Sequence, residues 1–235
     1  MRHFPALFAR QVRGYLYSPG FYVAMAVFLA VAGLNFWRLL AQSMQEDMSL
    51  AGMLFGSGYF WIVFLAVISA LTMPLLAEEK RSGAIETLLS APVTDVEVVL
   101  SKYFATLAAL AVICTPVLLY PRLASMFAAE AAPVDPVQMC GGWLAMMLCG
   151  AFFAALGLAV SALTRSQASA AVIGYPLMCL LFFCDYFENA VRGGAAAAVL
   201  DYLSSVRHVL DLAHGVLDTR PVFLYVSGAA FLLYL

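Results

Sequence analysis

The densest group of charged side chains in this chain is the run Glu78–Arg81, in which two acids precede Lys80 and Arg81. Three apolar residues follow at the i, i+3, i+4 spacing of one helix face: Ile85, Leu88 and Leu89. We therefore predict a short amphipathic helix parallel to the membrane, which proline ends at Pro92. Such a face is either a docking surface for another protein or only a solvated surface that fixes the orientation of the chain.

Paired acids also raise the question of hydrolysis. Glu78 and Glu79 resemble the paired-glutamate motif of some intramembrane proteases, but Gly83 stands where that motif has arginine. The three histidines, His3, His208 and His214, lie outside the apolar runs and supply no metal ligands there. A hydrolase is therefore a minor alternative, and we predict no catalytic residue and no metal site.

The composition identifies the class of protein. Of the 235 residues, 64% are hydrophobic and 11% are charged, whereas soluble domains have about 45–50% apolar and about 25% charged residues. The apolar residues form long continuous runs, and a chain in hydrocarbon must satisfy its backbone hydrogen bonds internally, so we expect spanning helices.

A net charge of −2 provides no surface for binding nucleic acid. The runs contain almost no ionisable residues, which argues against an ion-coupled carrier.

A spanning helix needs about 20 mostly apolar residues. Six runs are interpreted as spans, the last of them shorter than the others: Phe21–Leu40, Tyr59–Leu76, Tyr103–Tyr120, Met139–Leu163, Ala168–Phe187 and Pro221–Leu235. We predict an all-α membrane protein with six transmembrane helices in one domain over residues 1–235.

The first residues predict an amphipathic helix before the first span. Its apolar arc contains Phe4, Leu7, Phe8, Val12, Tyr15 and Leu16, and its polar arc contains Arg2, His3, Arg10 and Arg13. Such a helix lies in the membrane interface. Ser18-Pro19-Gly20 then ends it, since proline and glycine interrupt helices.

Two further patterns concern packing. The segment between the fifth and sixth spans, 188–220, has apolar residues at helical spacing and predicts an amphipathic helix or helix pair on the outer surface. The fourth span has a face of small residues, which allows close helix contact in a membrane: Gly150, Ala151, Ala154, Ala155, Gly157 and Ala159.

Basic residues near the span ends indicate the orientation, because they are enriched on the cytoplasmic side. If the N-terminus is cytoplasmic, most of these basic residues lie on the cytoplasmic side of the membrane: Arg2, Arg10, Arg13, Lys80, Arg81, Lys102 and Arg165. We expect a multi-pass protein of the cell's inner membrane in this orientation.

The charged run and its surroundings resemble a known family. Glu78–Gly83, Ile85–Leu89 and Ala91-Pro92-Val93, followed by Lys102 at the start of the next span, are similar to the ABC type-2 permeases. The segment His214–Arg220 is similar to the one before the sixth helix in the branch that contains the gliding-motility-associated permease. The chain departs from the pattern at Pro74, Ala84 and Ser101.

The resemblance implies a permease that pairs with itself or a sister permease and with two ATP-binding subunits. Its N-terminal interfacial helix, with Phe4, Phe8, Arg10 and Arg13, would contact those subunits. A coupling helix would insert into the ATPase through eight residues: Glu78, Glu79, Arg81, Gly83, Ile85, Glu86, Thr87 and Leu88. ATP and Mg²⁺ would bind to the partner, since this chain has no GxxxxGK[ST] phosphate loop.

The sequence leaves other points open. A membrane scaffold or assembly factor without transport is the main alternative function. The spans have no fixed charge that would define a cargo, so lipids, hydrophobic peptides, drugs or an extracytoplasmic machine all fit. Homodimer and heterodimer are equally compatible with the sequence.

Overall fold

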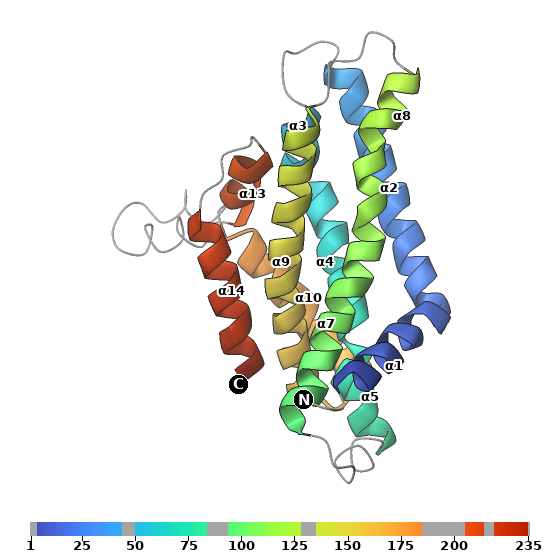
Figure 1. Ribbon diagram of the computed structural model, residues 1–235, viewed down its shortest axis with the longest axis vertical. Helices are drawn as coiled ribbons and strands as arrows, with labels where there is room; N and C mark the ends of the chain where they lie inside the picture. Colours follow the sequence, from blue (N-terminus) through green and yellow to red (C-terminus); the bar gives the residue numbers. More distant parts are fainter. Residues whose placement is uncertain are drawn as a thin grey trace.

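The computed structural model describes residues 4–43, 50–83, 94–127, 135–184, 205–213 and 219–234. Within these ranges every regular element is a helix. The helices form an elongated bundle, with most of them running along its long axis (Figure 1). This confirms the prediction of an all-α protein for the described part of the chain.

Four stretches in the described ranges are long and apolar enough to cross a membrane, and they match the first four predicted spans. They are formed by α2 (Pro19–Ser43), by α4 (Gly58–Thr72) with α5 (Pro74–Ser82), by α7 (Asp95–Cys114) with the 3₁₀ turn η1 (Thr115–Leu119), and by α9 (Pro136–Leu163). α10 (Gln167–Phe182) is apolar but shorter. α14 (Thr219–Tyr234) occupies the position of the predicted sixth span. Crossing of the membrane by these last two helices stays a prediction.

Three short helices complete the described fold. α3 (Leu50–Gly56) and α8 (Tyr120–Phe127) lie near one end of the bundle (Figure 1). α13 (Ser205–Ala213) packs on α9 and α3. It buries Val209 and Leu212 and exposes Asp211, which confirms an amphipathic helix in this part of the 188–220 segment.

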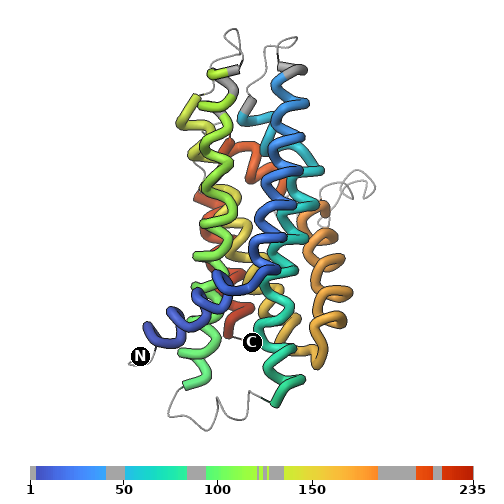
Figure 2. The backbone as a smooth tube through the Cα atoms, turned by 90° about the vertical axis from the view of Figure 1, so that its right-hand side faces the viewer, coloured from blue at the N-terminus to red at the C-terminus, as the bar shows by residue number. Residues whose placement is uncertain are grey.

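α1 (Phe4–Tyr17) slants across the bundle near the end that carries the N-terminus (Figure 2). It packs against α7, where Phe4 meets Phe104 edge-on with ring centroids 6.2 Å apart. Ser18 separates it from α2, and the Ser18 N–H donates to the Tyr15 carbonyl at 3.0 Å. The predicted helix and its break at Ser18 are both confirmed, whereas its place in the membrane interface stays a prediction.

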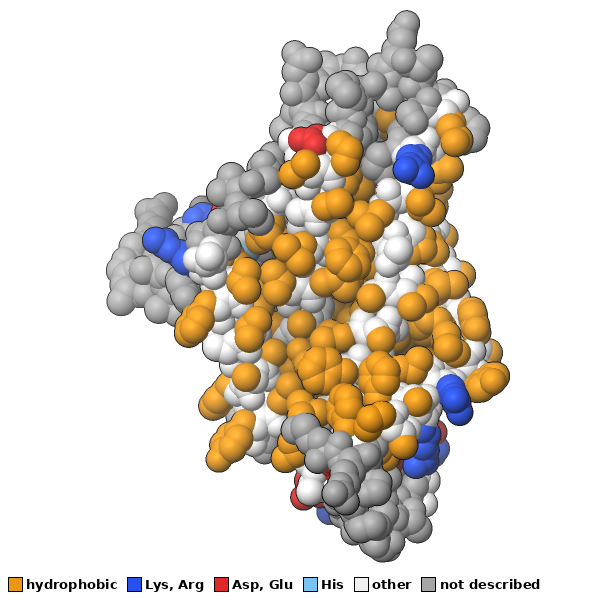
Figure 3. Space-filling model, viewed as in Figure 1, with side chains coloured by type: hydrophobic (Ala, Val, Ile, Leu, Met, Phe, Trp, Pro, Cys, Tyr) orange, Lys and Arg blue, Asp and Glu red, His pale blue; other side chains and the backbone are white. Residues whose placement is uncertain are grey.

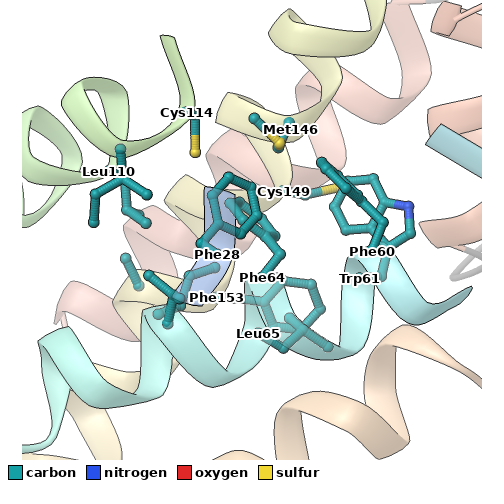
Figure 4. Packing of buried hydrophobic residues seen from close by; sticks show 14 of the residues in the cluster. Phe28, Phe60, Trp61, Phe64, Leu65, Leu110, Cys114, Met146, Cys149 and Phe153 are labelled. Atoms are coloured by element: carbon teal, nitrogen blue, oxygen red, sulfur yellow. The ribbon is translucent and has the colours of Figure 1, made fainter. Parts of the chain in front are cut away.

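Aromatic side chains fill the centre of the bundle (Figure 4). Phe28, Phe64 and Phe153, from α2, α4 and α9, are each no more than 1% exposed. Trp61 stacks on Phe182 of α10 with ring centroids 4.7 Å apart. Apolar side chains also cover the middle of the outer face in Figure 3, with charged ones near both ends. Because lipid is as apolar as these side chains, the core is held by close packing rather than by exclusion of water.

Two predicted boundaries are wrong. The third spanning helix begins at Asp95, eight residues before the predicted Tyr103, because Thr94 and Glu97 form a capping box that starts the helix there. The second runs on to Ser82, beyond the predicted end at Leu76, and is interrupted between Thr72 and Pro74. Both extensions carry charged residues, which a search for apolar runs leaves out.

Candidate functional site

The charged run of the sequence lies on α5, at the end of the second spanning stretch. We predicted that a separate helix begins at Glu78, and this is wrong for Glu78–Ser82, which continue the helix that Pro74 begins. Gly83 ends it in the left-handed conformation, with φ of 73°, which glycine adopts without steric cost. The other predicted coupling residues, Ile85, Glu86, Thr87 and Leu88, lie outside the described residues.

α5 meets the first turns of α7 and the last turns of α9 beneath α1, and we call this region the charged junction (Tyr15, Glu79, Lys80, Lys102 and Ser161). Its central contact is an ion pair between the Lys102 Nζ and the Glu79 Oε1, 2.6 Å apart. Lys102 also donates to the Leu75 carbonyl at 2.8 Å. Lys102 is only 4% exposed, and a buried charge is stable only when it is paired and hydrogen-bonded. These bonds therefore fix α5 against α7.

The other charged residues of α5 differ in their contacts: Lys80 bonds to α9, whereas Glu78 and Arg81 face outward. Lys80 donates to the carbonyl of Ala162 near the end of α9. Glu78 and Arg81 instead face outward, with side chains 50% and 70% exposed and a separation of 3.9 Å. An exposed pair of this kind contributes about 0–1 kcal/mol to stability. Glu79 and Lys80 thus hold the junction together, while Glu78 and Arg81 are free to contact another molecule.

α1 enters the junction through Tyr15, which is 7% exposed. Its hydroxyl lies 3.0 Å from the Leu71 carbonyl of α4 and 2.9 Å from the Thr106 hydroxyl of α7. Thr106 is in turn 2.9 Å from the Lys102 carbonyl. Burial raises the pKa of Tyr15 to about 12, although hydrogen bonds lower it in part, so the hydroxyl keeps its proton at neutral pH. α1 is therefore bonded to both neighbouring spans.

α9 enters the junction through Ser161, which is fully buried. Its Oγ donates to the Met73 carbonyl at 3.0 Å and accepts hydrogen bonds from the backbone N–H groups of Leu76 and Ala77. Ser161 therefore joins α9 to both sides of the interruption between α4 and α5.

A cavity of about 530 Å³ adjoins the junction. It lies between α1, α2, α4, α5, α7 and α10, and its polar lining includes Gln11, Ser18, Glu78 and Gln167. Among the residues that the structure describes, the buried Oε2 of Glu79 has no hydrogen-bond partner.

The predicted interfacial-helix residues take different positions. Phe4 and Phe8 are partly buried and stack on each other with ring centroids 6.1 Å apart. Arg10 and Arg13 are exposed, and Arg10 lines a small gap beside Glu79 and Lys102. The structure thus brings α1 and the charged run to the same end of the bundle.

The sequence analysis missed the roles of Tyr15, Lys102 and Ser161. It placed Lys102 at the start of a span, on the cytoplasmic side, because the helix start at Thr94 was not recognised. The T-x-x-E spacing of Thr94 and Glu97 is a capping-box signature and would have placed Lys102 two turns inside the helix. No comparable pattern marks Ser161, whose partners lie 84 and more residues away.

A sequence model described as ABC-2 family transporter protein matches residues 8–214. The chain belongs to the ABC-2 transporter family. No curated protein matches the chain.

Members of the ABC-2 family are membrane components of ABC transporters, in which the ATPase is typically a separate subunit. The apolar helices and the family together indicate a multi-pass membrane protein. Within the ranges that the structure describes, no group of three or more His, Cys, Asp or Glu side chains is placed to hold a metal ion.

Proposed function

We propose that this chain is the permease subunit of an ATP-driven ABC exporter and that the charged junction receives force from a separate ATP-binding subunit. The observation that carries the proposal is the position of α5. Its outer charges, Glu78 and Arg81, project from the end of the bundle, while Glu79 and Lys80 fasten the same helix to α7 and α9. A partner that moves the outer face of α5 therefore moves the bundle.

The contact with that subunit includes Glu78, Arg81 and the segment that follows Gly83, together with the polar face of α1. Arg10 and Arg13 are exposed at the same end as α5, so one partner surface can touch both helices. ATP and Mg²⁺ bind to the partner, because this chain lacks a phosphate loop. This end of the bundle is then cytoplasmic, in agreement with its basic residues.

The proposal includes a second permease, identical or related, and a place in the inner membrane. Two permeases and two ATPases give the two-state closing motion on which such machines depend. From the residues of the charged run and of the segment 214–220, we propose that the chain is similar to the branch that contains the gliding-motility-associated permease.

A binding experiment with charge reversal tests the contact. The ATP-binding subunit that the proposal requires is purified, and its affinity for the detergent-solubilised permease is measured with the Glu78→Lys and Arg81→Glu variants. We expect the Kd to rise at least tenfold, about 1.4 kcal/mol, and the effect to shrink at high salt. Asp211→Lys, at an exposed position of α13, is the control and leaves binding unchanged. Equal binding of all variants would refute the contact.

ATP turnover separates the permease from the scaffold alternative. We expect Glu86→Ala and Leu88→Ala to reduce or uncouple ATP hydrolysis by the reconstituted complex. A scaffold would retain its partner with ATP turnover unaffected by either change.

A further inference from the structure

The second spanning stretch is interrupted between α4 and α5. Proline has no backbone N–H, so Pro74 cannot donate to the carbonyl four residues earlier. The first N–H groups of α5 and the last carbonyls of α4 then need partners from elsewhere. An interruption without such partners is a hinge, at which the helix bends.

Ser161 of α9 supplies partners on both sides of this interruption. Its Oγ accepts from the N–H groups of Leu76 and Ala77 at 3.2 and 3.1 Å, and it donates to the Met73 carbonyl at 3.0 Å. A hydroxyl has one hydrogen to donate and two lone pairs to accept with. Ser161 therefore uses its whole hydrogen-bonding capacity on this one joint.

Side chains from two other helices donate hydrogen bonds to backbone carbonyls close to the interruption between α4 and α5. Tyr15 of α1 donates to the Leu71 carbonyl, and Lys102 of α7 donates to the Leu75 carbonyl. The interrupted segment is thus bonded to α1, α7 and α9.

Close approach of α9 makes the Ser161 contact possible. Gly157 lies one turn before Ser161, and a Cβ at this position would stand 2.2 Å from the Thr72 Oγ1. Only glycine leaves room for Thr72, the last residue of α4. The small residue and the serine therefore act as one packing unit.

We infer that Ser161 is a positioning residue that locks the interruption at Pro74, so that a displacement of α5 is passed to α9 instead of bending the second span. This role rests on the proposed function, because it deepens the account of how force from the ATP-binding subunit enters the bundle. Tyr15 supports the same joint from the opposite side, through α1.

Hydrogen–deuterium exchange tests the joint without reference to transport. In Ser161→Ala, the amides of Leu76 and Ala77 lose their acceptor, and we expect them to exchange at least tenfold faster. Ser101→Ala is the matched control, because within the described part of the chain the buried Ser101 hydroxyl bonds only the Val98 carbonyl of its own helix. Unchanged exchange in Ser161→Ala would overturn the inference.

A distance measurement in the complex with the ATP-binding subunit tests whether a displacement of α5 is passed to α9. Nitroxide labels are placed at Ser82→Cys on α5 and Leu163→Cys on α9, in a chain whose native cysteines are replaced. We expect the same narrow distance distribution with and without trapped ATP. In Ser161→Ala, the distribution should broaden or shift when ATP is trapped, whereas Ser101→Ala should behave as the unaltered chain.

Tyr15→Phe provides a second variant if Ser161→Ala fails to fold, because it removes one hydroxyl and keeps the ring. It is expected to change the distance distribution in the same direction by a smaller amount. An ATP-independent distribution in both variants would overturn the inference. If no ATP-binding subunit associates with the unaltered chain, the proposed function fails and the transmission role with it, while the exchange measurement still decides whether Ser161 holds the joint.

Discussion

The charged junction and the aromatic core hold the same helices together by different forces. At the junction, Tyr15, Lys102 and Ser161 bond to backbone groups of the second span, each at a fixed distance and direction. In the core, Phe64 and Phe153 are buried among apolar side chains without such bonds. Directional bonds specify one relative position of two helices, whereas apolar packing allows small shifts at little cost. The junction is therefore suited to transmit a displacement, and the core to keep the bundle assembled.

The largest expected effect comes from removing Glu79, the half-buried partner of the buried Lys102. Glu79→Ala leaves Lys102 charged and buried, and we expect a loss of about 3 kcal/mol in the free energy of unfolding. The measurement is reversible unfolding in mixed micelles. The adjacent Glu78→Ala removes only an exposed charge and should cost less than about 0.5 kcal/mol. Equal effects of the two changes would show that the junction is not held by this pair.

A steric change at the same end should have the next largest effect. Gly157→Ala places a methyl group 2.2 Å from the Thr72 Oγ1, so α9 must move away from α4. We expect a loss of about 2 kcal/mol and weaker contact of Ser161 with α5, visible as faster amide exchange there. Gly14→Ala on α1 is the control, since a Cβ at Gly14 meets nothing within 4 Å. Unchanged stability in Gly157→Ala would contradict the close approach.

A substitution in the aromatic core separates the two regions. It should lower the free energy of unfolding without changing how a displacement of α5 is passed to α9. Phe64→Leu removes part of a fully buried ring and should cost about 1 kcal/mol. The distance between labels on α5 and α9 should stay independent of ATP in this variant. A shift like that of Ser161→Ala would mean that the core, too, transmits the motion.

The smallest expected effect lies near the opposite end of the bundle. Arg38 stands 5.6 Å from the ring centroid of Tyr59, and exposed cation–π contacts contribute about 0.5 kcal/mol. Arg38→Gln should lower the free energy of unfolding by no more than this and leave binding of the ATP-binding subunit unchanged. Loss of that binding would place the partner at the wrong end of the molecule.

Much of the fold could be predicted from local patterns. The first and fourth spans and the helix Phe4–Tyr17 follow from continuous apolar runs or from helical periodicity, which depend on near neighbours only. The start of the third helix was missed because its first turns contain Asp95 and Glu97, although the capping box was legible in the sequence. Pro74 was noted only as a departure from the family pattern, although the missing N–H of proline already indicates an interruption of the helix at this position.

The sequence by itself determined the class of protein, the main spans and the end of the molecule where charge is concentrated, because composition and periodicity act over one or two helical turns. Only the tertiary structure decided which charges pair inside the bundle and which face outward: Glu78 and Glu79 are neighbours in sequence, yet a helix turns them about 100° apart, so that Glu79 pairs with Lys102 and Glu78 stays exposed. It also decided the role of Ser161, since a single hydroxyl acquires three partners only when α9 lies against the exposed backbone of a broken helix.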